Sequence, residues 1–176
     1  MIIFFMCKNN FIFLFFFLFS TLLAAKEPVL STLVTIVSNE VHEFKNGNYK
    51  YMCRPYGVYT LEELYRNAKK DSVCQKSIQS FYNKNPNLLN YSHQKLNTFQ
   101  SYSIVFKNQK CVISVAGEKS YSEFLLEEGL ALKVPAKLGK EYDFLFMKVQ
   151  REAKKEKKGL WNENISKECA SSIDAK

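Results

Sequence analysis

The sequence predicts a mixed α+β fold that is rich in β-structure, with a small, mostly antiparallel sheet and about three helices. Three observations support this prediction. Short runs of β-branched and aromatic residues are joined by hairpin signals, helix-capping signatures interrupt these runs, and the last long segment repeats its apolar residues at helical spacing. Because the strands and helices do not alternate one for one, a parallel βαβ architecture is not expected.

The strands are expected in two pairs. The runs Leu30–Val37 and Tyr49–Arg54 lie on either side of Asn46-Gly47. An Asn-Gly pair favours a type I′ hairpin turn, in which both central residues adopt positive φ. Ser101–Phe106 and Cys111–Ala116 flank the sequence KNQK, which predicts a second hairpin.

Two helices are predicted from the residues at their ends. Thr60 and Glu63 have the spacing of a capping box, in which a hydroxyl and a carboxylate satisfy the free N–H groups at a helix start. Ser120 and Glu123 repeat this spacing before FLL, and Gly129 suits the end of that helix because glycine readily adopts positive φ.

A last helix is predicted from Lys140 to Lys158, ended by Gly159. Its apolar face consists of Tyr142, Leu145, Val149 and Ala153. The basic stretch Lys148–Lys158 can contact a nucleic-acid backbone, although such a run is more often the solvated face of an amphipathic helix.

Between a helix near Ser72–Phe81 and the second hairpin, the sequence predicts a surface loop. This segment, Asn83–Asn97, is polar, rich in asparagine and contains Pro86. Long loops of this kind are either functional or insertions.

The N-terminus predicts export. Phe11–Ala25 is an almost uninterrupted apolar run behind Lys8, and its length of roughly 15 residues falls short of the 20 or so that span a bilayer. We therefore expect residues 1–25 to be a secretory signal peptide, with an uncleaved anchor as the alternative. After cleavage the protein is expected to be periplasmic or secreted and not inserted in a membrane.

The remaining chain suits one domain, residues 26–162, followed by a polar tail, residues 163–176. The whole chain carries a net charge of +8, which becomes +7 when Lys8 is removed with the signal. A basic exported domain favours anionic partners such as nucleic acid or a lipid surface, although the charge can also serve solubility alone. A monomer is expected.

The cysteines and histidines indicate which kinds of covalent bond, metal site and catalysis are expected. Four cysteines follow the signal, an even number that suits disulfides in an oxidising compartment, and three pairings are possible. No spacing indicates a zinc site. The two histidines give little support to histidine-based nucleophilic catalysis. These residues are Cys53, Cys74, Cys111 and Cys169, with His42 and His93.

Two C-terminal segments resemble a known family. SYSEFLLEEGLALKV (Ser120–Val134) and VQREAKKEKKGLW (Val149–Trp161) are similar to the C-terminal half of staphylococcal-nuclease-like domains. The resemblance is clear over Tyr121–Trp161 and fainter over Leu30–Glu62. It implies an OB-fold, that is, a five-stranded barrel with about three helices.

The same resemblance implies a phosphodiesterase site. Members of the family carry Arg-x-x-x-x-Asp-Thr-x-Glu, and this chain has RPYGVYTLE (Arg54–Glu62). By this match Arg54 binds phosphate, the Thr60 carbonyl helps to hold calcium, and Glu62 is the general base. Glu40 falls at the upstream metal-binding acid. Tyr59 replaces the metal-binding Asp, and a phenol is a poor substitute because calcium prefers carboxylate and other hard oxygen ligands.

A second charged position has also changed. Gln109 stands where the family has a further Arg, and Lys107 or Lys110 can lend a charge there without the bidentate fork of a guanidinium. The loss of one transition-state donor typically costs about a hundred- to a thousandfold in rate. The resemblance therefore implies an exported calcium-dependent phosphodiesterase (endonuclease) of weakened activity on DNA or RNA.

Two other functions compete with this one. The first is a non-catalytic OB-type module that binds nucleic acid, with bases stacked on tyrosines of the sheet. The second is a protein-interaction module of the cell envelope. The retained residues also have structural explanations, because Thr60 can merely cap a helix and Glu62 can complement a helix dipole. The tyrosines available for stacking are Tyr49, Tyr51, Tyr56 and Tyr59.

Overall fold

The computed structural model of the 176-residue chain describes residues 27–107, 109–115 and 119–170. The predicted signal peptide and the end of the polar tail lie outside these ranges. Within them, none of the helices has the length and apolarity that a membrane span needs.

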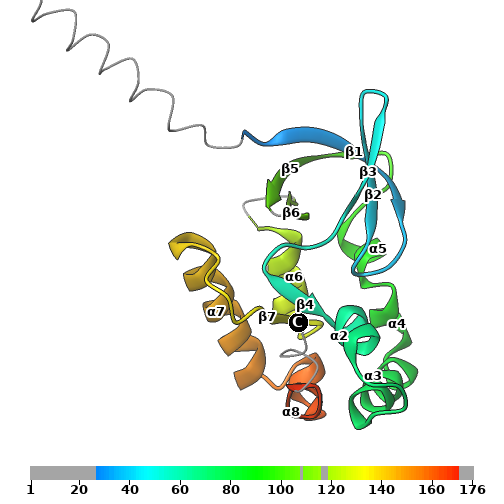
Figure 1. Cartoon of the computed structure of the whole chain (residues 1–176), viewed down its shortest axis with the longest axis vertical. Helices are drawn as coiled ribbons and strands as arrows, with labels where there is room; N and C mark the ends of the chain where they lie inside the picture. Colours follow the sequence, from blue (N-terminus) through cyan, green and yellow to red (C-terminus); the bar gives the residue numbers. More distant parts are fainter. Residues whose placement is uncertain (1–26, 108, 116–118, 171–176) are drawn as a thin grey trace, which may run out of the picture.

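The predicted α+β fold is confirmed by a five-stranded antiparallel sheet with helices packed against it and below it (Figure 1). The order of strands is β3-β2-β1-β5-β6, and a separate two-stranded sheet joins β4 to β7. One strand of the main sheet, β2, was not among the expected runs. The strands are β1 (Val29–Ile36), β2 (His42–Asn46), β3 (Tyr49–Cys53), β4 (Val58–Thr60), β5 (Ser101–Lys107), β6 (Lys110–Ser114) and β7 (Ala131–Lys133).

The closed barrel implied by the resemblance is not formed by strand pairing among the described residues. β3 and β6 are the edges of the sheet, and they meet only beyond β3, where Pro55 forms an isolated bridge with Cys111. The Cys111 amide donates to the Arg54 carbonyl at 2.8 Å, and the Tyr56 amide donates to the Cys111 carbonyl at 2.9 Å. A disulfide from Cys53 to Cys111 ties the same two edges.

The predicted hairpin at KNQK is present. The hairpin at Asn46-Gly47 joins β3 to β2 and not to the predicted run Leu30–Val37, and its turn differs in type. In the β2–β3 hairpin Asn46 pairs with Tyr49, so the two turn residues are Gly47 and Asn48. Of these two, only Gly47 has positive φ (57°), which is the φ pattern of a type II′ turn and not of type I′. In the β5–β6 hairpin Lys107 pairs with Lys110.

The helices begin where the capping signals predicted. Ser120 and Glu123 form the full capping box, with the Ser120 amide 2.7 Å from the Glu123 carboxylate. Thr60 accepts from the Glu63 amide at 3.1 Å, but the Glu63 carboxylate has another partner. More helices exist than the three expected: α2 (Leu61–Asn67), α3 (Val73–Lys84), α4 (Pro86–Leu89), α5 (Tyr91–Lys95), α6 (Tyr121–Glu127), α7 (Lys140–Lys155), the 3-10 turn η1 (Gly159–Trp161) and α8 (Ile165–Glu168).

The segment predicted as a surface loop, residues 83–97, is instead packed structure. It contains α4 and α5, and Tyr91, Ser92 and Leu96 are buried. The prediction was wrong because the polar asparagines dominate the composition, whereas these three buried residues carry the packing. Asn85 also caps α3 through a bond from its side chain to the Phe81 carbonyl.

Two glycines allow a close contact between two backbone segments in the C-terminal half. α7 ends at Lys155, three residues before the predicted end, and the chain then turns so that Gly159 meets Gly129. The Leu160 amide donates to the Gly129 carbonyl at 2.9 Å. A side chain at either glycine would overlap the opposing backbone. The Gly-Leu motifs after α6 and α7 are therefore explained by a close contact between the two backbones.

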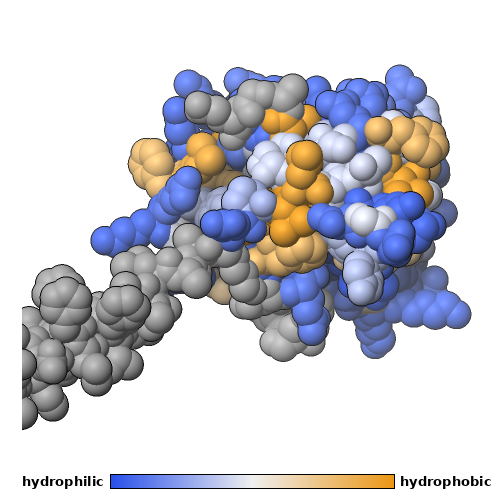
Figure 2. Space-filling model, turned by 90° about the horizontal axis from the view of Figure 1, so that it is seen from above, coloured by the Kyte–Doolittle hydropathy of each residue, from blue (hydrophilic) through white to orange (hydrophobic). Residues whose placement is uncertain are grey.

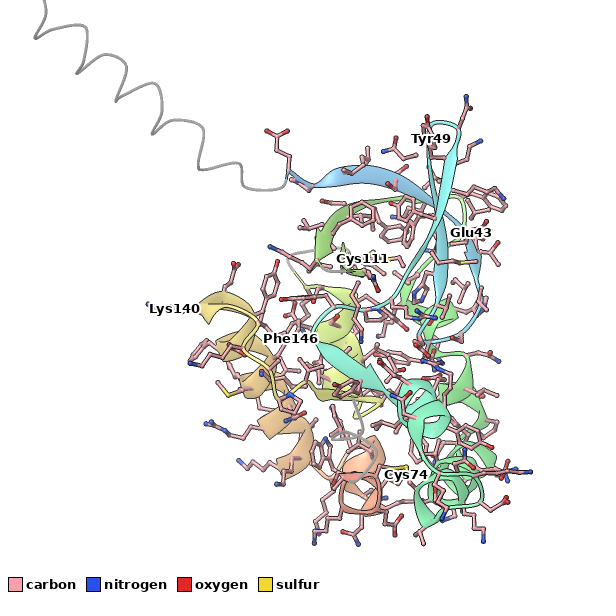
Figure 3. The ribbon with its side chains drawn as sticks, viewed as in Figure 1. Glu43, Tyr49, Cys74, Cys111, Lys140 and Phe146 are labelled. Carbon is pink, nitrogen blue, oxygen red and sulfur yellow. A yellow bond between two sulfur atoms is a disulfide. The ribbon has the colours of Figure 1, made fainter. Side chains whose placement is uncertain are left out.

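The apolar face of α7 packs on the core as predicted. Tyr142, Leu145 and Val149 are partly buried against the core, and Ala153 is buried. The face also contains Phe146, which is fully buried and points toward α6, whereas Lys140 points away (Figure 3). At the other end of the molecule, a disulfide from Cys74 to Cys169 joins α3 to the end of α8.

Candidate functional site

The turn between β1 and β2 is held by its own serine and asparagine. The Ser38 hydroxyl accepts from the amides of Glu40 (3.1 Å) and Val41 (3.2 Å). The Asn39 side chain donates to the carbonyls of Leu88 (2.9 Å) and Leu89 (3.2 Å), at the end of α4. The segment predicted as a loop therefore anchors the turn that carries Glu40.

A buried polar network completes this anchor. The Ser92 amide donates to the Asn39 side-chain oxygen at 2.8 Å, and the Tyr121 hydroxyl donates to the Asn39 carbonyl at 3.2 Å. His42 contacts the Ser92 hydroxyl, and burial lowers the pKa of His42 to about 4. This histidine is therefore neutral at physiological pH, which suits a structural role and not acid–base chemistry.

Glu40 is buried beneath two guanidinium groups. Arg66 donates to both carboxylate oxygens of Glu40 at 2.6 Å, and the Arg54 Nε lies 3.1 Å from Oε1. The Glu40 side chain is 2% exposed, whereas the two arginine side chains are 51% and 53% exposed. The bond to Glu40 raises the pKa of Arg66 above its usual range. The carboxylate thus fixes two cations at the surface.

A second buried carboxylate fixes a third cation. The Lys110 ammonium lies 2.9 Å from the Glu63 carboxylate and donates to the Val58 carbonyl at 3.0 Å. It also lies 5.4 Å from the centre of the Tyr59 ring, a cation–π distance. Glu63 is 4% exposed and Lys110 24%.

These two ion-pair groups line one polar pocket of about 320 Å³, which we name the cation pocket. Its three cations and two carboxylates give a formal charge of +1. Gln109 reaches it from the β5–β6 turn, where its backbone has a φ of 65°. The lining residues are Glu40, Arg54, Glu63, Arg66, Asn67, Gln109 and Lys110.

A disulfide holds the two sides of the cation pocket in register. Arg54 directly follows Cys53, and Lys110 directly precedes Cys111. The bond between the two cysteines therefore fixes the backbone next to both cations, with the Cα atoms 5.7 Å apart. The pairings Cys53–Cys111 and Cys74–Cys169 are one of the three possibilities that the sequence left open.

Residues 32–163 of this chain match the protein family described as staphylococcal nuclease homologue. The chain belongs to this family. Membership confirms the resemblance seen in the sequence and implies an OB-like arrangement for the five-stranded sheet. A comparison with curated proteins gave no match.

The structure brings together four of the residues that the family resemblance selected. Glu40, Arg54, Gln109 and Lys110 all line the cation pocket. Lys107 does not line it, although it pairs with Lys110 across the hairpin.

Thr60 and Glu62 are placed elsewhere. The Thr60 hydroxyl caps α2. Glu62 lines a different and mainly apolar hollow of about 300 Å³ between α2 and α3, where it accepts from the Tyr82 hydroxyl at 3.2 Å. Burial raises the pKa of Glu62. Glu62 and Arg54, the proposed base and phosphate ligand, thus line separate hollows.

The prediction missed Arg66, Glu63 and Asn67 as residues of the pocket. They lie three and four positions apart on α2, so they share one face of that helix. The helix itself was predicted from its cap. The spacing of these polar residues along it is the sequence signal from which they could have been found. The resemblance drew attention to Glu62, whose neighbour Glu63 faces the pocket instead.

The donor set around the cation pocket does not fit calcium. Calcium takes about six to eight oxygen ligands, carboxylates among them. Arg66 already occupies both oxygens of Glu40. The Val58 carbonyl and the Glu63 carboxylate accept from the Lys110 ammonium, and Tyr59 presents its ring face to the same ammonium. Within the described residues no three metal-ligating side chains cluster.

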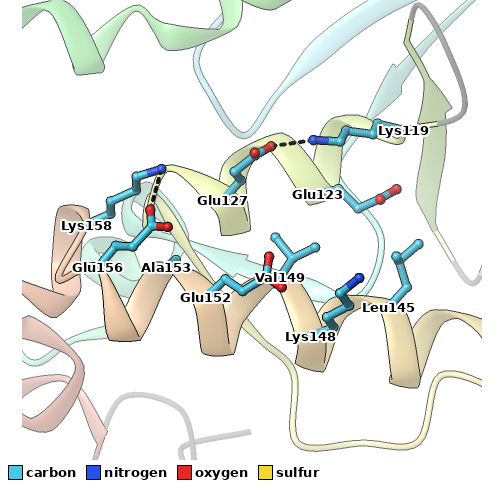
Figure 4. A pocket seen from close by; sticks show the side chains of 10 residues that line it. All are labelled: Lys119, Glu123, Glu127, Leu145, Lys148, Val149, Glu152, Ala153, Glu156 and Lys158. Carbon is cyan, nitrogen blue, oxygen red and sulfur yellow. Dashed lines mark hydrogen bonds and ion pairs between the residues drawn. The ribbon is translucent and has the colours of Figure 1, made fainter.

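A third hollow, of about 260 Å³, lies between α6 and α7 (Figure 4). Four carboxylates and three lysines line it, and Lys119 and Lys158 are paired with Glu127 and Glu156. The Lys154 ammonium lies over the Trp161 ring at 5.5 Å. These pairings favour the interpretation of the Lys-rich helix as a solvated face.

The tyrosines proposed as a stacking platform mostly pack the fold. Tyr51 lies between Phe44 and Phe106, and Tyr56 contacts Tyr142. Tyr49, which is 82% exposed, projects at the tip of the β2–β3 hairpin (Figure 3). Seen from that end of the molecule, hydrophobic side chains are interspersed with hydrophilic ones (Figure 2).

Proposed function

We propose that this member of the staphylococcal nuclease homologue family is an exported protein that binds DNA or RNA through phosphate contacts at the cation pocket. The observation that supports this is the pair of half-exposed guanidinium groups held by one buried carboxylate. Arg54 and Arg66 are fixed in place before a ligand arrives, so binding costs little side-chain entropy.

The anchored arginines retain donors for a ligand. A guanidinium has five N–H donors, of which Arg66 uses two on Glu40 and Arg54 uses its Nε. The remaining donors, together with the formal charge of +1, suit a phosphate oxygen pair. The net charge of the predicted mature chain adds a longer-range attraction for a polyanion.

Binding of a fluorescent single-stranded oligonucleotide, followed by anisotropy over a range of salt concentrations, tests this function. Arg54→Gln is expected to weaken binding about tenfold and to reduce the slope of log K against log salt by about one. Lys45→Gln is the matched control, because Lys45 is exposed on β2 and does not line the pocket. Absence of binding even at low salt contradicts the proposal.

Hydrolysis of phosphodiester bonds is the second candidate. Family membership and the shared position of Arg54 and Glu40 favour it. Because Tyr59 and Gln109 replace two charged members of the family pattern and the donor set does not fit calcium, any cleavage is expected to be slow. Incubation of single-stranded DNA with calcium tests it, with an Arg54→Ala/Glu62→Ala variant as the control. Equal product from both proteins removes the catalytic function.

Export is supported by the cysteines as well as by the predicted signal peptide. Two disulfides suit an oxidising compartment such as a periplasm or the extracellular space. Mass spectrometry of the secreted fraction is expected to give a chain that begins at Lys26, and a full-length membrane-associated chain contradicts this expectation.

A further inference from the structure

Lys110 occupies surroundings that resemble a cation site. A carbonyl oxygen, a carboxylate oxygen and an aromatic face surround its ammonium group, from Val58, Glu63 and Tyr59. The Glu63 side chain is almost fully buried, and the Lys110 side chain is about three-quarters buried. Burial of a carboxylate is costly unless a cation compensates it, so the lysine is an integral part of this arrangement.

Glu40 shows the same pattern on the other side of the pocket. Its two oxygens are bonded by the fork of Arg66, and Arg54 adds a third contact. Each buried carboxylate of the pocket therefore already carries a protein cation. A divalent ion would have to displace an ammonium or a guanidinium from bonds of 2.6–2.9 Å before it could bind.

We propose that Lys110, Arg66 and Arg54 are built-in cations that supply the positive charge of this pocket, so that it binds a phosphate-ester oxyanion without a divalent metal. This inference rests on the proposed function, because it assumes that the pocket contacts phosphate. The inference also assigns a role to Tyr59. Its ring face favours the Lys110 ammonium, whereas the Asp of the family pattern at this position would favour a metal ion.

The charges of the pocket support this assignment. With its five ionised groups the pocket is at +1, so a phosphodiester of charge −1 balances it. An ammonium has three N–H donors, and Lys110 uses two of them on Val58 and Glu63. The third donor and the outer edges of the guanidinium groups are the groups that would meet the oxyanion.

The first test is calcium titration into the protein alone, followed by calorimetry. No binding at millimolar calcium is expected, and binding with a millimolar or tighter Kd overturns the inference. This measurement needs no nucleic acid, so it stands even if the proposed function fails.

The second test compares oligonucleotide affinity in EDTA and in calcium at equal ionic strength. The two affinities are expected to agree within about twofold, because the phosphate contacts use no metal. A tenfold or larger gain with calcium overturns the inference alone. Absence of binding in both buffers contradicts the proposed function.

Variants of Lys110 complete the second test. Lys110→Gln is expected to lower affinity in EDTA about tenfold, whereas Lys110→Arg, which keeps the charge, is expected to retain most of it. Lys45→Gln controls for the loss of one surface charge, and circular dichroism confirms that each variant is folded. If Lys110→Gln binds as tightly as Lys45→Gln, the inference is overturned.

Discussion

The C-terminal glycine contact and the cation pocket are both close contacts between segments far apart in sequence, yet they differ in what they require. At Gly129 and Gly159 two backbones touch, and no other residue fits. At the pocket, charged side chains touch, and each buried carboxylate is bonded to at least one cation. The first contact therefore depends on the absence of side chains, whereas the second depends on the charges of the side chains.

The largest expected effects concern the two disulfides. Cys53–Cys111 lies beside the cation pocket, and Cys74–Cys169 joins α3 to the end of α8. Cys74→Ser/Cys169→Ser is expected to lower the free energy of unfolding by about 4 kcal/mol, because the bond closes a loop of 95 residues, without changing oligonucleotide affinity. Cys53→Ser/Cys111→Ser is expected to cost a similar amount and also to weaken binding about tenfold. Denaturant unfolding and anisotropy measure the two quantities.

Equal affinity losses in the two double variants would contradict the idea that Cys53–Cys111 holds the cation pocket in register. Each variant is compared with the wild type under non-reducing conditions, at a temperature where both are folded.

The glycine contact gives the next effect. Gly159→Ala is expected to cost about 3 kcal/mol, because the methyl group meets the Gly129 carbonyl at a residue with a φ of 50°. Gly47→Ala is the matched control, since its φ is 57° but nothing lies near its added methyl group. We expect about 1 kcal/mol there. Thermal unfolding measures both, and similar losses would show that backbone conformation and not packing makes Gly159 necessary.

A buried ion pair gives a smaller effect in the pocket. Arg66→Gln leaves the buried Glu40 with Arg54 alone and is expected to cost about 2 kcal/mol, less than a fully buried pair because Arg66 is half exposed. Glu40→Gln/Arg66→Gln is expected to recover part of that loss, because no buried charge is then left at position 40. A double-mutant cycle measures the coupling. Additive losses would contradict the pairing.

The sequence could predict the parts of this fold that depend on local spacing. The β5–β6 hairpin, the turn after Asn46, the caps at Thr60 and Ser120 and the helical face of α7 follow from patterns of a few residues. The packing of residues 83–97 could not be predicted, because it depends on Asn39, more than 40 residues away.

The candidate site was predictable to the same degree. Arg54, Glu40, Gln109 and Lys110, which the family spacing selected, line one pocket. The spacing did not tell which of two adjacent glutamates faces the pocket. Glu62 and Glu63 differ by about 100° around α2, and that difference decides which carboxylate meets Lys110.

The smallest effect compares two acids. Glu62 is half-buried and forms no ion pair within the described part of the chain, whereas Glu40 is buried and pairs with two cations. Burial raises the pKa of Glu62 above its ordinary value of 4.5, so the folded protein holds that proton more tightly than the unfolded chain. The stability from this group is present below about pH 4.5 and is lost as pH rises through the folded pKa.

Glu62→Gln keeps an acceptor for Tyr82 and is expected to stabilise the protein at pH 7 by about 1 kcal/mol. Glu40→Gln is expected to destabilise it, because it leaves two guanidinium groups with a weaker partner. Unfolding curves from pH 4 to 8 measure the difference, and a destabilised Glu62→Gln variant would mean that this carboxylate is satisfied as an ion.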